Sequence, residues 1–187
     1  MSTKREDIIA ATLRVTNSRG FAGTSTDIIA KEANVGKGTI YKYFESKEQL
    51  FSSLFNELQT KFVHLIAANY KFDLDLKTNF KNLVSFLINY YVAHDDEFRY
   101  LERYSDIGLN ISKPIEELTK LIEPITKMFK EANHNIKFKK LPPLVLFAIT
   151  YGPLVAVVNL VLLGKIELSE ELVDQIGESC WESILDK

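Results

Sequence analysis

Residues 24 to 44 decide the fold of this protein, and they read TSTDIIAKEANVGKGTIYKYF. The pattern predicts a helix over residues 26–33, which a hydroxyl at Thr24, Ser25 or Thr26 can begin by accepting a hydrogen bond from an unpaired backbone N–H. A turn follows at residues 34–36, because Asn34 tolerates left-handed backbone better than most residues. A second helix begins near Lys37 and spans roughly two turns. Two short helices joined by a tight turn therefore precede the rest of the chain.

The second of these helices has an inner and an outer face. At about 100° per residue, Ile40 and Phe44 lie on one side, which we expect to face the core. The opposite side and its flank carry Gly38, Thr39, Lys42 and Tyr43. A bare glycine, polar side chains and a cation suit entry into the major groove of DNA, where they meet base edges and phosphates. The alternative is a small solvated helix whose exposed residues happen to be polar.

The same stretch resembles the DNA-binding signature of the TetR family of bacterial regulators. The resemblance rests on Ile29-Ala30, residues 33–44 and the helix start at residues 46–50, where Ser46 and Gln49 form a capping box. It implies an all-α homodimer of about nine helices per chain. An N-terminal three-helix helix-turn-helix domain, residues 1–49, is joined by a long helix to a C-terminal effector-binding and dimerisation domain, residues 50–187.

The resemblance also implies which residues contact double-stranded DNA. Carried over position by position, the phosphate or base contacts come from Thr26, Gly36, Lys37, Gly38, Thr39, Tyr41, Lys42, Tyr43 and Lys47. Two departures from the family pattern stand out. The turn has Asn34-Val35-Gly36 where Gly-Val-Ser is common, which removes one hydroxyl from the phosphate-facing edge. Thr12 and Thr16 occupy positions where the first helix usually has Ala and a large apolar residue, which affects local packing.

Composition favours a helical protein, and the distribution of charge is compatible with DNA binding near the N-terminus. Apolar residues make up 46% of the 187 residues, and the 8 Gly and 5 Pro leave little room for a turn-rich β architecture. Residues 1–49 contain eight Lys or Arg and six Asp or Glu, a net +2, whereas the whole chain has a net charge of −2. A mildly basic N-terminal segment followed by an acidic remainder of the chain fits a modular DNA-binding protein. The lone cysteine, Cys180, suits a reducing compartment, and we expect a cytoplasmic protein without a signal peptide.

Apolar periodicity predicts the remaining helices. They fall at about residues 4–19, 46–66, 75–93, 96–107, 112 onward, 141–164 and 169–184. Gly20 ends the first of them as a left-handed cap, after which Phe21 turns back to the core. Pro124 is expected to kink the helix that begins at Ser112.

Residues 141–164 contain no charged side chain, which raises the possibility of a membrane span. Thr150, Gly152-Pro153 and Asn159 in its middle argue against one, and we expect no membrane partner. A helix buried on nearly all sides, partly by a second copy of the chain, explains the composition better. The expected homodimer interface uses this helix and the last one, through Phe147, Val155, Asn159, Leu172, Ile176 and Trp181.

The sequence has no motif of an enzyme. There is no phosphate-binding glycine loop, paired-cysteine metal site, His-Glu-x-x-His or nucleophile elbow, so we expect neither catalysis nor a cofactor. The run His94-Asp95-Asp96-Glu97 lacks metal-ligand spacing and is better explained as a helix start. No metal site is expected.

Aromatic and polar residues of the body could line an effector pocket. The candidates are Phe62, Phe86, Asn89, Tyr90, Tyr104, Thr150 and Tyr151. Ordinary helix packing is the alternative for each of them. Together with the resemblance, this predicts a repressor that a small, largely apolar effector releases from a pseudo-palindromic operator. The rival interpretation is a helical interaction module, attached to a membrane through residues 141–163, that has no sequence-specific DNA binding.

Overall fold

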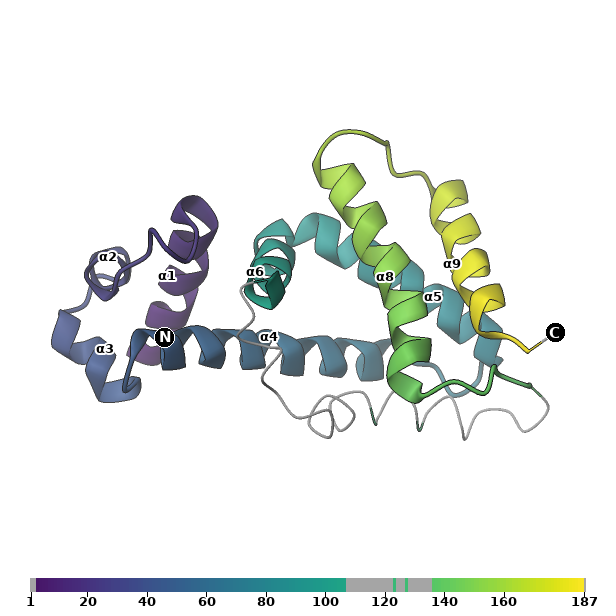
Figure 1. Ribbon diagram of the computed structural model, residues 1–187, viewed down its shortest axis with the longest axis horizontal. Coiled ribbons are helices and arrows are strands. Elements are labelled where there is room, and N and C mark those ends of the chain that lie inside the picture. The colour runs from purple at the N-terminus through teal and green to yellow at the C-terminus, as the bar shows by residue number, and fades with distance from the viewer. Residues whose placement is uncertain (1–2, 107–122, 124–126, 128–135, 187) are drawn as a thin grey trace. The chain divides into compact units, whose positions relative to one another are not determined.

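The structure is a computed structural model that describes residues 3–106, 123, 127 and 136–186. Its named helices are α1 Lys4–Arg19, α2 Thr26–Glu32, α3 Lys37–Tyr43, α4 Lys47–Asn69, α5 Leu76–Ala93, α6 Asp95–Asp106, α8 Pro143–Leu162 and α9 Glu170–Ile184 (Figure 1). Within the described residues there is no strand, only an isolated antiparallel bridge between Phe138 and Leu185. The predicted all-α fold is confirmed. The helix expected from Ser112, with its kink at Pro124, lies outside the described residues.

The described residues form two compact units. The first takes its residues from Met1–Thr60 and Asp96–Ser112, and the second from Lys61–Asp95 and Lys113–Lys187. The boundary therefore falls inside α4, and α6 belongs to the N-terminal unit although it follows α5 in the chain. This division by compactness differs from the expected one after residue 49. The assignment of separate roles to residues 1–49 and 50–187 stays a prediction.

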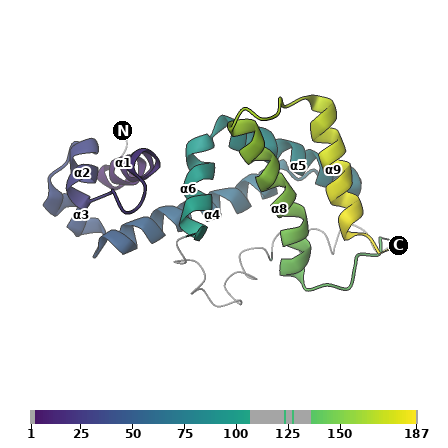
Figure 2. The ribbon, with the colours of Figure 1, turned by 45° about the horizontal axis from the view of Figure 1, so that its top comes forward.

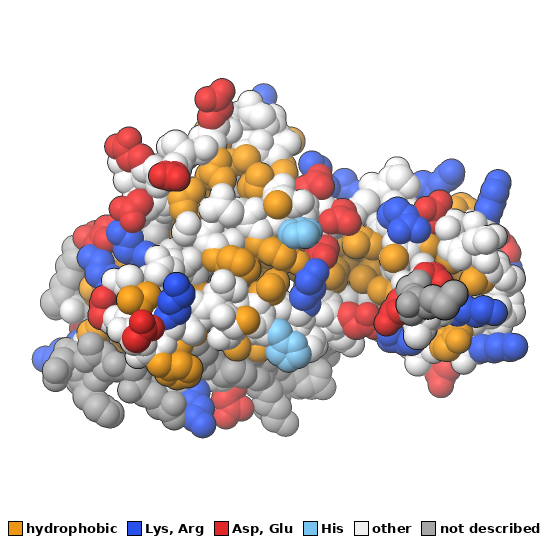
Figure 3. Space-filling view, turned by 180° about the vertical axis from the view of Figure 1, so that it is seen from behind, with side chains coloured by type: hydrophobic (Ala, Val, Ile, Leu, Met, Phe, Trp, Pro, Cys, Tyr) orange, Lys and Arg blue, Asp and Glu red, His pale blue; other side chains and the backbone are white. Residues whose placement is uncertain are grey.

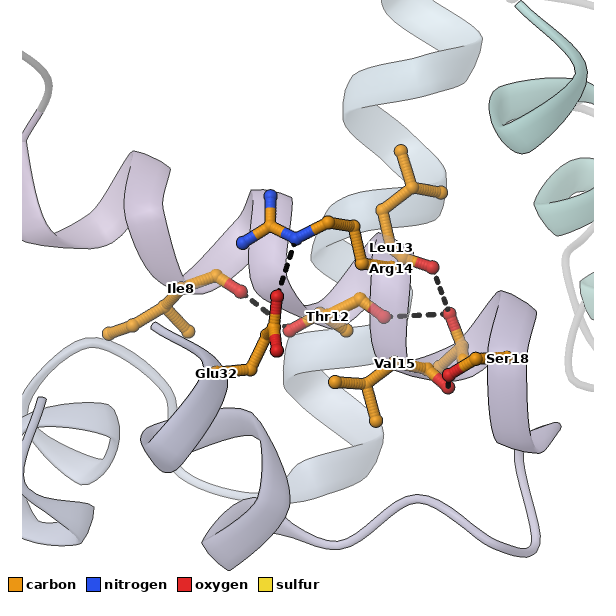
Figure 4. Close-up of polar contacts among 8 residues, drawn as sticks. Ile8, Thr12, Leu13, Arg14, Val15, Ser18 and Glu32 are labelled. Atoms are coloured by element: carbon orange, nitrogen blue, oxygen red, sulfur yellow. Dashed lines mark hydrogen bonds and ion pairs between the residues drawn. The ribbon is translucent and has the colours of Figure 1, made fainter. Parts of the chain in front are cut away.

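In the first unit, α1 packs against α2 and α3 around Ile8, Val15, Ile29 and Ile40. Thr12 and Thr16, the two unusual residues of α1, are buried as well. Their hydroxyls donate to the carbonyl oxygens of Ile8 and Thr12, each at 2.7 Å (Figure 4). Because each buried hydroxyl has an acceptor one turn earlier in its own helix, the two threonines fit the core without an unpaired polar group.

Helix α1 begins with a capping box and ends at a glycine with positive φ. Thr3 and Glu6 form a capping box that the sequence analysis did not predict. Gly20 has a positive φ of 70°, as expected, but its ψ of 169° is extended and not left-handed helical. The backbone after α1 therefore continues in an extended conformation. The centroid of the Phe21 ring lies 5.2 Å from that of Phe51.

Helix α6 is held in the first unit by aromatic packing and hydrogen bonds. The Tyr104 ring stacks on Phe55 with centroids 4.4 Å apart, and the Tyr100 hydroxyl donates to the Phe51 carbonyl oxygen at 2.9 Å. The Asn17 side-chain amide of α1 donates to the Asp96 carbonyl oxygen at 2.7 Å. These contacts join residues about 50 to 80 positions apart, and they explain why α6 groups with α1 rather than with α5.

In the second unit, α9 packs against both α5 and α8 (Figures 1 and 2). Trp181 of α9 is buried between Phe80 and Phe138, with ring centroids 5.4 and 6.0 Å away. On the outside of the same contact, Lys81 of α5 pairs with Asp174 of α9 at 2.7 Å.

Helix α8 is largely exposed in the single chain. Only Leu154 and Val158 of this helix are buried, while Val145 and Leu160 are among the exposed large apolar residues of the chain. The expected burial of this helix includes a second copy of the chain, so it stays a prediction. Among the described helices, α8 alone is long and apolar enough to cross a membrane by length and composition, a criterion that core helices of soluble proteins also meet.

Candidate nucleic-acid interface

The turn between α2 and α3 has the conformation that its sequence predicts. The Ser25 hydroxyl caps α2 by accepting from the Ile28 N–H. Asn34 has a φ of 53°, in the left-handed region that Asn tolerates. The Val35 N–H then donates to the Ala30 carbonyl oxygen at 2.9 Å, and Gly36 becomes the N-cap of α3. Local backbone chemistry therefore sets the angle at which α3 leaves α2.

Helix α3 has the two faces expected from its period. Ile40 and Phe44 are buried, whereas Gly38 and Lys42 are exposed. A Cβ atom built on Gly38 would meet nothing within 4 Å beyond its chain neighbours and the backbone of its own helix, so the helix surface is open at that residue. Tyr41 and Tyr43 also lie outward, with exposed fractions of 49% and 45%. Several Lys and Arg side chains, with Asp and Glu beside them, lie on the surface of this end of the chain (Figure 3).

Thr26 is not an exposed residue of this face. Its exposed fraction is 7%, and its hydroxyl oxygen lies 3.3 Å from the phenol oxygen of Tyr41. Thr26 is therefore better placed to hold Tyr41 than to reach a duplex itself. Its expected DNA contact came from the family resemblance, and no sequence pattern indicates that its hydroxyl meets a side chain of α3.

The three predicted lysines have different surroundings. Lys37 pairs with Asp27 of α2, with the Nζ and Oδ2 atoms 2.8 Å apart, and this hydrogen bond raises the pKa of Lys37. Lys47 is half-buried, and its ammonium lies 3.3 Å from the Thr24 carbonyl oxygen and 5.6 Å from the centre of the Phe51 ring. Lys42 has no ion-pair partner among the described residues. Asp27 was missed because no sequence pattern links residues on the two helices.

The candidate effector residues are divided between the two units. Phe62 lies near Phe147 and Tyr151, with centroids 6.5 and 5.6 Å away, all in the second unit. Tyr104, by contrast, is buried in the first unit, where its ring stacks on Phe55, and its role in an effector pocket stays a prediction.

The other candidates have separate surroundings. Phe86 and Tyr90 stack on each other along α5, and the Thr150 hydroxyl donates to carbonyl oxygens of its own helix. Asn89 lines a polar hollow of about 500 Å³ between α5 and the start of α9. Among the seven candidates, ring contacts join Phe62 to Tyr151 and Phe86 to Tyr90.

Helices α8 and α9 form an apolar groove of about 320 Å³ on the second unit. It is lined by Ile149, Pro153, Val157, Leu172, Gln175, Ile176, Ser179, Cys180 and Ser183. Two predicted interface residues, Leu172 and Ile176, are in this lining. Trp181 is instead buried in the core of its own chain, so we leave it out of the proposed interface.

Comparisons with known proteins agree with this architecture. Residues 8–54 match the family model for bacterial regulatory proteins of the tetR family, and residues 55–185 match the tetracyclin repressor-like C-terminal domain. The HTH-type transcriptional regulator YhgD of Bacillus subtilis is 29% identical over 125 residues, 65% of each protein. The HTH-type transcriptional repressor NicS of Pseudomonas putida is 33% identical over 93 residues, 49% of this chain and 43% of NicS. The matched segments thus span less than two thirds of either relative.

A solved structure has the same fold over nearly its whole length. The TetR family transcription regulator from Marinobacter aquaeolei VT8 aligns with a TM-score of 0.86 at 22% identity, covering 98% of this chain and 96% of that one. The fold and the matched models define a helix-turn-helix regulatory protein, a class that is not enzymatic. The chain belongs to the TetR family of bacterial regulatory proteins.

Proposed function

We propose that the protein is a dimeric transcription regulator that binds double-stranded DNA through α3 and represses from a pseudo-palindromic operator. One observation carries the DNA-binding part. Ile40 and Phe44 anchor α3 to the core, which leaves Gly38 and Lys42 exposed on the outer face, where Lys42 forms no ion pair with another described residue. A backbone that can approach closely, beside a free cation, is what base-edge and phosphate contacts require. Repression is the role stated in the name of the Pseudomonas relative.

The homodimer follows from α8 and α9. Their exposed apolar groove and the exposed side chains of α8 support an interface with a second copy. A two-fold symmetric pair would place its two α3 helices in successive major grooves about 34–36 Å apart. The operator is therefore expected to be an inverted repeat whose half-sites are separated by one helical turn.

A small, largely apolar effector would control this binding. The aromatic group of Phe62, Phe147 and Tyr151 in the second unit supports such a ligand. The effector changes the DNA affinity only through its preference for one conformation over another, typically by about 1–3 kcal/mol. We infer that effector binding tilts α4 and thereby alters the spacing of the two α3 helices.

The proposal is tested by selecting bound duplexes from a random pool at two salt concentrations. An inverted repeat recovered at the higher concentration is the expected result, because sequence-independent phosphate binding falls steeply with salt. A pool that stays random at both concentrations would contradict a sequence-specific regulator.

The exposure of α8 keeps one other function open, a helical interaction module attached to a membrane through residues 141–163. This alternative predicts that the protein sediments with membranes in the absence of detergent and selects no DNA sequence. Recovery from the soluble fraction, together with an inverted repeat from the selection, would exclude it.

A further inference from the structure

The first turn of α2 contacts two outward side chains of α3. Thr26 places its hydroxyl 3.3 Å from the Tyr41 phenol, and the neighbouring Asp27 pairs with Lys37 at 2.8 Å. The ion pair is open to solvent, since the exposed fractions of the Lys37 and Asp27 side chains are 51% and 66%. A carboxylate therefore lies on the surface that is proposed to meet the DNA backbone.

An exposed ion pair of this kind contributes little to folding stability. It does, however, favour positions of the Lys37 ammonium close to the Asp27 carboxylate. A phosphate that approaches α3 must compete with Asp27 for Lys37. If Lys37 moves to the phosphate, the Asp27 carboxylate is left uncompensated beside a polyanion. Either way, Asp27 opposes phosphate contact at this corner of the helix-turn-helix.

We propose that Asp27 limits sequence-independent DNA binding by holding Lys37 away from the phosphates. The inference rests on the proposed function and assigns a role to a residue that is not itself a contact residue. Non-specific binding is supplied almost entirely by phosphate contacts, so an occupied lysine weakens it directly. Lys42 is exposed and has no such ion-pair partner among the residues that the structure describes, so no carboxylate competes with a phosphate for it there.

The test uses the full chain and a random-sequence duplex, with affinity measured by fluorescence anisotropy over a series of salt concentrations. Asp27→Asn is expected to tighten binding by about threefold or more at low salt. It should also steepen the slope of log K against log salt by about 0.9, the value for one additional phosphate contact. Glu32→Gln is the matched control, because Glu32 is also an exposed acid of α2 and pairs with Arg14 at 2.7 Å (Figure 4). It removes the same charge without releasing Lys37.

Lys37→Gln then separates a released lysine from a general charge effect. If Asp27 occupies Lys37, Lys37→Gln costs more affinity in the Asp27→Asn chain than in the wild type. Equal costs in both chains, or an equal gain from Glu32→Gln and Asp27→Asn, would overturn the inference. A wild-type chain that binds the duplex while Asp27→Asn changes nothing rejects only this inference. A wild-type chain that binds no duplex rejects the proposed function as well.

Discussion

Lys42 and Lys47 show how two lysines of one motif can differ once the chain is folded. Lys47 is half-buried, with its ammonium near the Thr24 carbonyl oxygen and the face of Phe51, so its side chain also supports the domain. Lys42 lies on the exposed face of α3 and has no ion-pair partner among the described residues. A change at Lys42 should therefore report on DNA binding alone, whereas a change at Lys47 affects both binding and folding.

We predict that Lys42→Ala weakens binding to a random-sequence duplex and makes the slope of log K against log salt shallower by about 0.9, because one phosphate contact is lost. Lys47→Ala should weaken binding with little change in sequence preference and also lower the melting temperature. Anisotropy titrations and thermal unfolding measure the two effects. Lys165→Ala, an exposed lysine outside the helix-turn-helix, is the control. If Lys42→Ala and Lys47→Ala both bind with wild-type affinity at low salt, the assignment of the outer face of α3 to DNA would be contradicted.

Tyr100 ties α6 to α4 through one buried hydroxyl, and it gives the first unit a dependence on alkaline pH. Burial raises the pKa of the Tyr100 phenol well above its ordinary value of 10.0. The unfolded chain loses this proton near pH 10, while the folded chain keeps it. The stability that Tyr100 contributes is therefore complete below pH 10 and is lost as the pH rises towards the folded-state pKa.

Tyr100→Phe removes both the hydrogen bond to the Phe51 carbonyl oxygen and the titrating group. We predict a loss of about 1 kcal/mol in the free energy of unfolding at pH 7. The difference between wild type and variant should shrink above pH 10, since only the wild type is destabilised by ionisation there. Denaturant unfolding at several pH values provides the measurement. A constant difference from pH 7 to pH 11 would show that the buried phenol does not control this response.

Helix α3 is too short to be stable by itself, because seven residues make few helical hydrogen bonds for the entropy lost in forming the first turn. It persists because its inner residues are buried and because Gly36 and the turn before it set its start. Gly38 and Lys42 on the outer face are exposed and therefore bury little surface that would stabilise the helix. Substitutions on the outer face are therefore expected to alter binding without altering folding.

Gly38→Ala tests this expectation within a single variant. Alanine is the better helix former by about 1 kcal/mol, and a Cβ at residue 38 would meet nothing within 4 Å beyond its chain neighbours and the backbone of its own helix, so the melting temperature should stay equal or rise. If α3 enters the major groove with its backbone close to the bases, the added methyl should reduce operator affinity. A variant that is as stable as the wild type and binds as tightly would argue that Gly38 does not face the duplex.

The exposed apolar surface of α8 and α9 can be recognised only in the folded chain. The composition of either helix does not show which of its apolar residues the rest of the chain leaves uncovered. The α8 helix buries two residues within the chain, and the groove beside α9 is open. Contiguous exposed apolar surface of this kind marks an interface in soluble proteins. A second copy that presents the same two helices would cover it symmetrically.

Leu160→Glu should therefore convert the proposed dimer into a monomer while leaving the fold of each chain intact, because Leu160 is 42% exposed and a charge in the proposed interface would be buried without a partner. Phe72→Glu is the matched control, since Phe72 is 91% exposed in the loop between α4 and α5. Sedimentation equilibrium gives the mass of each variant. Binding to an inverted repeat should fall with dimer loss. A dimeric Leu160→Glu chain would move the proposed interface away from this part of α8.

Much of the candidate interface could be predicted because its signals are local. The turn at Asn34, the N-cap at Gly36 and the inward direction of Ile40 and Phe44 all depend on neighbours within one or two turns. The same local chemistry explains why most helix boundaries agree with the periodic pattern to within one or two residues. The roles of Thr26 and Asp27 could not be predicted in this way, because each depends on a side chain of another helix.

The sequence by itself determined the helical class, the helix-turn-helix and the outward direction of Gly38 and Lys42, since capping, turn conformation and helical period act between residues close in the chain. Only the tertiary structure decided that α6 belongs with the N-terminal unit, that Asp27 holds Lys37, that Trp181 is buried and that α8 is exposed. These features depend on which surfaces meet after the chain has turned back on itself. Hydrophobic burial drives such meetings without direction, so no local pattern specifies the partner.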